Sequence, residues 1–113
     1  MQPPSSPADV QSLRQRGLAL AQAGRFAEAV APLEAAARLD PTHANTLNNL
    51  GLVLRELGRR TEAEQVLRQG LAVAPGSVTI ANSLGLVLMD LGRLPDAERV
   101  FRAALAFGGD NVD

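Results

Sequence analysis

Few side chains in this sequence are suited to catalysis or to binding a metal ion. The 113 residues contain one histidine and no cysteine, and all 11 basic residues are arginine. The chain therefore has no thiolate nucleophile, no lysine for a Schiff base or a phosphate-binding loop, and no cluster of histidine ligands. His43 stands in a predicted turn, where we expect a solvated imidazole. We predict no catalytic residue, no metal and no cofactor, and hence no enzyme.

Carboxylates are the remaining groups that could exchange protons with a substrate. Two pairs lie close in sequence, Asp90 with Asp96 and Glu62 with Glu64. Acid–base chemistry near neutral pH requires a shielded site that separates the two pKa values. Because no such site is indicated, we interpret both pairs as solvated helix faces.

The charge and the hydropathy of the chain disfavour two classes of partner. The formal net charge is −1, which provides no attraction for nucleic acid or for an anionic membrane. No apolar run approaches the roughly 18 residues of a membrane-spanning helix. Residues 1–6 lack the basic and apolar segments of a secretory signal. We therefore predict a cytoplasmic protein that does not insert into membranes.

An internal repeat of 34 residues dominates the organisation of the chain. Aligning residues 44–77 with residues 78–111 gives 15 identities in the 34 positions. Repeats of this length predict a stacked array of similar units. The residues that recur in all three units are Gly17, Gly51 and Gly85, Gly24, Gly58 and Gly92, Arg25, Arg59 and Arg93, and Ala29, Ala63 and Ala97.

Each unit shows the apolar spacing of two helices, with no two-residue alternation typical of a strand. Gly58 supplies the left-handed residue that ends the first helix of the middle unit. Thr61 with Glu64 predicts a capping box for the second helix, and Ser77 predicts the cap of the helix after it. Gly51 lies inside a helix, and we expect it to face the small Ala63 so that the two helix axes come close.

These repeats resemble the tetratricopeptide repeat family, whose unit is a 34-residue pair of antiparallel helices. The resemblance implies an all-α fold, an alpha-alpha superhelix (right-handed solenoid) of three helix-turn-helix units near residues 10–43, 44–77 and 78–111. We expect a Pro/Ser-rich leader at 1–6, the repeat domain at 7–108 and a tail at 109–113. The family's markers are Leu50 with Gly51 and Leu84 with Gly85, Ala63 and Ala97, and Pro41 and Pro75.

Two departures from the family pattern concern packing. Where the family favours a large aromatic residue, the chain has Leu13, Leu47 and Ala81, which predicts an underfilled third unit. Arg16 replaces the leucine found at the same place in the other units, which suits an exposed terminal repeat.

The resemblance implies a scaffold or adaptor that binds an extended peptide or a partner helix on a concave face lined by the first helix of each unit. Asparagine amides there can bond a peptide backbone, and Leu18, Leu52 and Leu86 form an apolar row. Alternatively, Leu52 and Leu86 belong to the core between repeats, and Asn49 braces the adjacent repeat. The candidate contacts are Arg14, Leu18, Asn48, Asn49, Leu52, Arg55, Asn82, Leu86 and Met89.

One subclass of the family holds the C-terminal carboxylate of chaperones with basic and amide side chains. The matching positions here are Arg14, Leu18, Asn49, Thr79 and Ser83. The cations expected in the third unit are missing, so we predict that no carboxylate clamp is present.

Two alternative functions remain open. The last unit predicts exposed apolar residues at Val100, Leu105 and Phe107, which favours self-association into a homo-oligomer. Phe107 is also consistent with a residue that fills its own repeat. The other alternative is a regulatory repeat segment of a larger enzyme.

Overall fold

Six helices and the short turns between them make up the described part of the chain. The structure is a computed structural model that describes residues 7–109. The expected leader lies outside these residues, as does the expected tail except for Gly109, which ends the last helix. No strand occurs in the described range, as the helical spacing predicts. The helices are α1 (Pro7–Gln22), α2 (Phe26–Leu39), α3 (Ala44–Glu56), α4 (Arg60–Val73), α5 (Val78–Asp90) and α6 (Leu94–Gly109).

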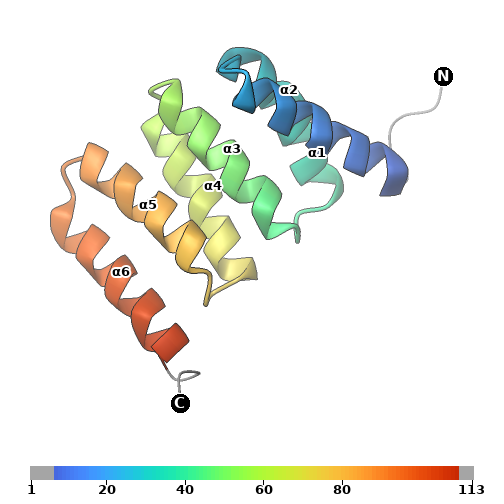
Figure 1. Ribbon diagram of the computed structural model, residues 1–113. Coiled ribbons are helices and arrows are strands. Elements are labelled where there is room, and N and C mark those ends of the chain that lie inside the picture. Colours follow the sequence, from blue (N-terminus) through green and yellow to red (C-terminus); the bar gives the residue numbers. More distant parts are fainter. Residues whose placement is uncertain (1–6, 110–113) are drawn as a thin grey trace.

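The helices form three antiparallel pairs that stack in chain order (Figure 1). The first helices of neighbouring pairs contact one another, α1 with α3 and α3 with α5. Within residues 7–109 the backbone of α4 contacts neither α2 nor α6. The second helices therefore spread apart on the outer side of a curved stack, and the first helices lie on the inner side. This arrangement is an all-α helical repeat solenoid.

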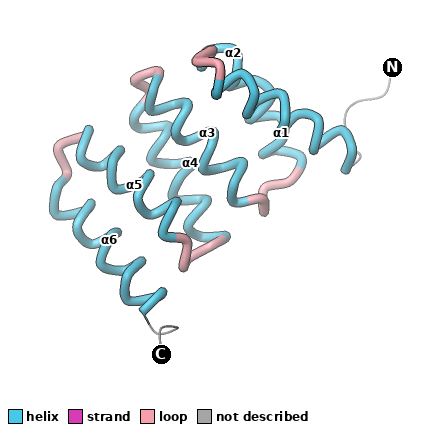
Figure 2. The backbone as a smooth tube through the Cα atoms, viewed as in Figure 1, coloured by secondary structure: helices cyan, strands magenta, loops and turns pink. Residues whose placement is uncertain are grey.

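A glycine in the left-handed conformation ends the first helix of every pair. Gly24, Gly58 and Gly92 have φ angles of 78°, 78° and 76°. These residues lie in the turns within each pair, which follow one another along one edge of the stack in Figure 2. Because this φ disfavours any residue with a Cβ atom, the repeated glycine fixes where each helix reverses direction.

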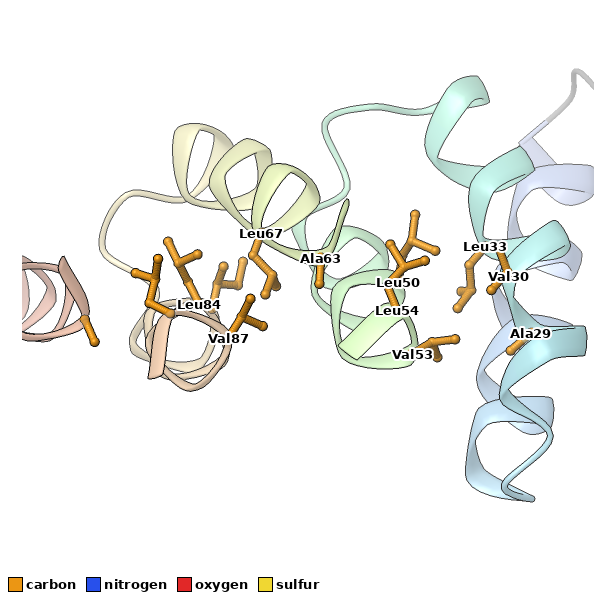
Figure 3. Close-up of a cluster of buried hydrophobic side chains, with 13 residues drawn as sticks. Ala29, Val30, Leu33, Leu50, Val53, Leu54, Ala63, Leu67, Leu84 and Val87 are labelled. Carbon is orange, nitrogen blue, oxygen red and sulfur yellow. The ribbon is translucent and has the colours of Figure 1, made fainter. Parts of the chain in front are cut away.

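The apolar core is continuous through the stack (Figure 3). Leu33 of α2 lies in the same buried cluster as Leu50 of α3, and Leu67 of α4 lies in it with Leu84 of α5. Each of these four side chains is at most 3% exposed. A single pair cannot cover both faces of its helices, so neighbouring pairs complete each other's core.

The nearest neighbours of the helix glycines are not the alanines that we expected. A Cβ added at Gly51 would lie 2.5 Å from Cγ of Leu67, and one at Gly17 would lie 2.5 Å from Cγ of Leu33. The closest neighbour of Gly51 is thus a large side chain one helical turn beyond Ala63. The glycine makes room for a leucine that inserts between the helices, which fills the interface better than two small residues would.

The capping box predicted at Thr61 and Glu64 is also wrong. Arg59 occupies the N-cap of α4 without a capping side-chain bond, so Thr61 already lies inside the helix. The Arg59 guanidinium instead donates to Glu62 over 2.8 Å and 2.7 Å. Its hydrogen bond is the main cause that lowers the pKa of Glu62. Arg25 pairs with Glu28, and Arg93 with Asp96, in the same way.

Side-chain caps do occur at the helices that begin a pair. Ser77 Oγ accepts the backbone N–H of Ile80 at 3.1 Å, which confirms the predicted cap of α5. His43 does the same for α3, because its Nδ1 accepts the N–H of Thr46 at 3.2 Å. The imidazole that we expected to be free in a turn is therefore partly buried and holds the start of a helix.

The third pair is underfilled, as the sequence predicts. Ala81 is 1% exposed and stands where the middle unit has Leu47. It borders a hollow of about 190 Å³ between the end of α4 and the α5–α6 pair, which is also lined by Leu71, Pro75, Arg99, Val100, Ala103 and Ala104.

Replacement of Gly51 by alanine tests the close contact with Leu67. In an ordinary helix the change would add about 1 kcal/mol of stability, but here the new methyl group collides with Leu67. We expect Gly51→Ala to lower the free energy of unfolding by about 1–3 kcal/mol, measured by urea denaturation. Adding Leu67→Val should recover part of the loss. A stabilised Gly51→Ala protein would contradict this packing.

Replacement of Ala81 by leucine tests the hollow in the third pair. The larger side chain restores the residue type of the middle unit, and we expect it to stabilise the protein by about 1 kcal/mol. Ala97→Leu is the matched control, because Ala97 is 2% exposed and lines none of the described hollows. Overpacking should make that control destabilising by about 1–3 kcal/mol. Equal effects of the two changes would refute the assignment.

Candidate functional site

The inner side of the stack has a groove between α1 and α3. It consists of two hollows, one of about 360 Å³ toward the start of α3 and one of about 240 Å³ toward the end of α1. Asn49 of α3 lines both hollows and so lies at the middle of the groove. We call these two hollows together the α1–α3 groove.

Apolar and amide side chains make up most of the groove. Leu18 and Leu33 provide apolar surface in the larger hollow, and Leu52 provides it in the smaller one. Leu18 remains 39% exposed, so its side chain is available to a ligand. The amide and hydroxyl groups that border the groove belong to Gln15, Gln22, Asn45, Thr46 and Asn49.

The basic residues near this face are engaged in ion pairs with partner acids. Arg14 Nη2 lies 2.6 Å from Oδ2 of Asp40, and Arg55 Nε lies 2.5 Å from Oδ2 of Asp90. Hydrogen bonding by Arg55 holds the pKa of the Asp90 carboxyl below its ordinary value. The pKa of Asp40 is lowered first by its hydrogen bonds with Thr42 and then by the charge of Arg14. The groove is therefore suited to an uncharged ligand segment.

The structure brings together four of the predicted contact residues. Arg14, Leu18, Asn49 and Leu52 all border the α1–α3 groove.

Other predicted contacts lie elsewhere on the first helices. Asn82, Leu86 and Met89 are exposed on α5, and Leu86 and Met89 are 41% and 48% exposed. Arg55 links α3 to the C-terminal end of α5 through Asp90. These side chains border neither of the two hollows.

Asn48 does not present its amide to the groove. Its side chain is 8% exposed, and its Oδ1 is buried without a hydrogen-bond partner. Asn82 has the same register in the next unit and is exposed. The difference arises because α5 lies alongside α3, whereas within residues 7–109 no further helix lies beyond α5 on that side.

Several groove residues were missed in the sequence. Asn45 precedes Asn49 by one helical turn, so the helical spacing alone could have identified it. Phe26 and Glu56 border the smaller hollow. Phe26 begins the second helix of its pair, and the repeat pattern does not show that this end of α2 reaches the groove.

Of the three residues predicted for self-association, Val100 and Phe107 share one face of α6, and Leu105 lies on another face. Val100 packs against the core, and the Phe107 ring lies 2.5 Å from where a Cβ of Gly76 would be. Phe107 thus packs against the turn before α5, although it is still 52% exposed. Leu105 is 68% exposed and lies on a different face of α6 from Val100 and Phe107.

Two further kinds of feature are absent from residues 7–109. No helix there is long and apolar enough to cross a membrane. No group of three histidine or acidic side chains in the described range is placed to hold a metal ion.

Comparisons with known proteins agree with the helical pairs. Two family profiles, both described as tetratricopeptide repeat, match residues 9–75 and residues 48–112. No curated protein matches the chain.

Solved structures of similar fold include MamA and SycD. MamA AMB-1 is 26% identical with a TM-score of 0.80, and the match covers 88% of this chain and 54% of that one. MamA MSR-1 is 22% identical with a TM-score of 0.84, covering 95% and 62%. The Yersinia enterocolitica type III secretion translocator chaperone SycD, in an alternative dimer, is 19% identical with a TM-score of 0.84, covering 90% and 77%. The chain thus spans little more than half of these MamA chains.

The ion pair of Arg55 with Asp90 predicts a pH dependence of stability. Because the folded-state pKa of Asp90 is lowered, the stabilisation is present above the unfolded-state pKa of about 3.9 and is lost as the pH falls through the folded-state value. We expect Asp90→Asn to reduce stability by up to about 1 kcal/mol near neutral pH, with the difference vanishing in acid. Urea midpoints across this range measure it, and a difference that grows on acidification would contradict the assignment.

Proposed function

Since this chain belongs to the tetratricopeptide repeat family and is a protein–protein interaction module, we propose that the α1–α3 groove binds an extended segment of a protein partner. The central observation is the position of Asn49 between two apolar hollows. An extended peptide presents a backbone N–H and C=O at every residue, and one amide side chain can bond both. Leu18 and Leu52 on either side would receive apolar side chains of the same segment.

The ligand we propose is an uncharged internal segment. Arg14 and Arg55 already pair with Asp40 and Asp90, which leaves them less able to hold a terminal carboxylate. In the third unit, Ser83 is 5% exposed and its hydroxyl donates to the carbonyl of Thr79. This geometry supports the view that recognition depends on backbone bonds and apolar contacts.

A peptide selected from a random display library provides the probe for this proposal. We expect the affinity of such a peptide for Asn49→Ala and for Leu18→Glu to fall by about tenfold or more, since each change removes one mode of recognition. Fluorescence anisotropy with the labelled peptide measures the affinity. Amidation of the peptide C-terminus should leave binding unchanged, because no clamp for a carboxylate is proposed.

Leu105→Glu is the matched control for the groove variants. It introduces the same charge at an exposed leucine of α6, far from α1. Peptide binding should survive this change, and circular dichroism should show the same helicity in all variants. If Leu18→Glu and Leu105→Glu weaken the peptide equally, or neither does, the groove is not the binding site.

A further inference from the structure

The helix α6 lies at one end of the stack (Figure 1), and one of its faces exposes large apolar side chains. Leu94 and Leu105 are 58% and 68% exposed. Helical spacing places Glu98 and Arg102 on or beside the same stripe, whereas the Phe101 ring packs inward against Gly85 of α5. We call Leu94, Glu98, Arg102 and Leu105 the α6 outer face. Among the helices of residues 7–109, the backbone of α6 contacts α5 alone.

The corresponding positions of the inner pairs face the following pair. Ala37, at the register of Leu105, borders a hollow with Leu47 and Leu50 of α3. Leu71, at the same register, borders one with Ala81 of α5.

Residues at two further equivalent positions of the repeat also lie against the following pair. Phe26, at the register of Leu94, lies beside Val53 of α3. Glu64, at the register of Glu98, accepts a hydrogen bond from Arg93 of the following unit. The α6 outer face therefore corresponds to positions that the following pair contacts, at both inner junctions for Leu105 and at one junction each for Leu94 and Glu98.

The opposite end of the stack is not suited to cover it. Arg16 is exposed on α1 at the register where Leu50 and Leu84 are buried, and Ser12 is exposed where Ile80 is buried. Stacking the α1 end of one molecule on α6 of another would bury the Arg16 charge and the Ser12 hydroxyl against leucine, which is costly without partners. A head-to-tail array is disfavoured.

The outer face is instead complementary to itself. If two α6 helices lie antiparallel about a two-fold axis near their middle, Leu94 of one copy meets Leu105 of the other. The same axis places Glu98 opposite Arg102. In the single chain these two residues already form an exposed ion pair at 2.6 Å. Within a dimer, four charges would alternate around the axis, flanked by apolar contacts.

We propose that the α6 outer face binds a second copy of this chain, with the two α6 helices antiparallel. The α1–α3 groove lies at the other end of each molecule (Figure 1). A dimer of this kind would therefore present two open grooves that point away from the shared axis.

Sedimentation equilibrium of the chain at micromolar to millimolar concentrations tests the dimer. We expect a concentration-dependent dimer, and no larger species, because a two-fold interface closes on itself. Leu105→Glu should raise the dissociation constant by about tenfold or more. Leu18→Glu, which places the same charge at an exposed leucine of α1, is the control and should leave the mass unchanged.

Charge reversal tests the antiparallel pairing. Glu98→Arg alone and Arg102→Glu alone should each weaken the dimer, because like charges then meet twice across the axis. An equal mixture of the two variants should form heterodimers, since every charge again faces its opposite. The antiparallel arrangement predicts both the loss in each variant alone and the rescue in the mixture, whereas a parallel in-register pair would already place like charges opposite each other in the unchanged chain.

Four outcomes would overturn the proposal. A monomer at every concentration would show that no second copy binds. A dimer insensitive to Leu105→Glu would place the interface elsewhere. A mixture of the two charge variants that stays monomeric would exclude the antiparallel pairing, and growth beyond a dimer would indicate head-to-tail stacking. Unchanged circular dichroism of each variant confirms that the fold is retained.

Discussion

The insertion of one large side chain against a helix glycine sets the geometry of each pair. Leu33 lies against Gly17, and Leu67 lies against Gly51, so close that a methyl group on either glycine would overlap the leucine. This contact fixes the distance between the two helices of a pair and their relative position along the helix axes. The neighbouring pair then packs on the surface that this alignment creates, and the curvature of the whole stack follows from repeating it.

That curvature explains why the groove lies where it does. Because α1 and α3 converge on the inner side, their side chains face each other across a narrow gap. Arg14 and Arg55 could have filled this side with positive charge, but each is paired with an acid from a neighbouring segment. The α1–α3 groove is left with amides, apolar side chains and the carboxylate of Glu56, and its chemistry matches a peptide backbone better than a terminal carboxylate.

Much of the fold could be predicted from the 34-residue interval, because turn glycines and caps act locally. Gly58 and Ser77 have the structural roles that their residue types indicate. Contacts between helices were harder to predict. The choice between Ala63 and Leu67 as the nearest neighbour of Gly51 depends on the crossing angle of the two helices, which the sequence spacing does not specify. The burial of Asn48 beside the exposure of Asn82 could not be predicted from register, because it depends on which helices have a neighbour.

The last helix, α6, buries smaller side chains than α2 and α4, and this has a dynamic consequence. The buried residues of α6 include only the alanines Ala97 and Ala104, whereas α2 and α4 bury Leu33 and Leu67. The free energy of local opening rises with the apolar area that a segment buries. Backbone amides of α6 should therefore exchange their hydrogens, and become open to proteases, before those of the central helices. A partner bound to the α6 outer face would therefore also slow the local opening of this helix.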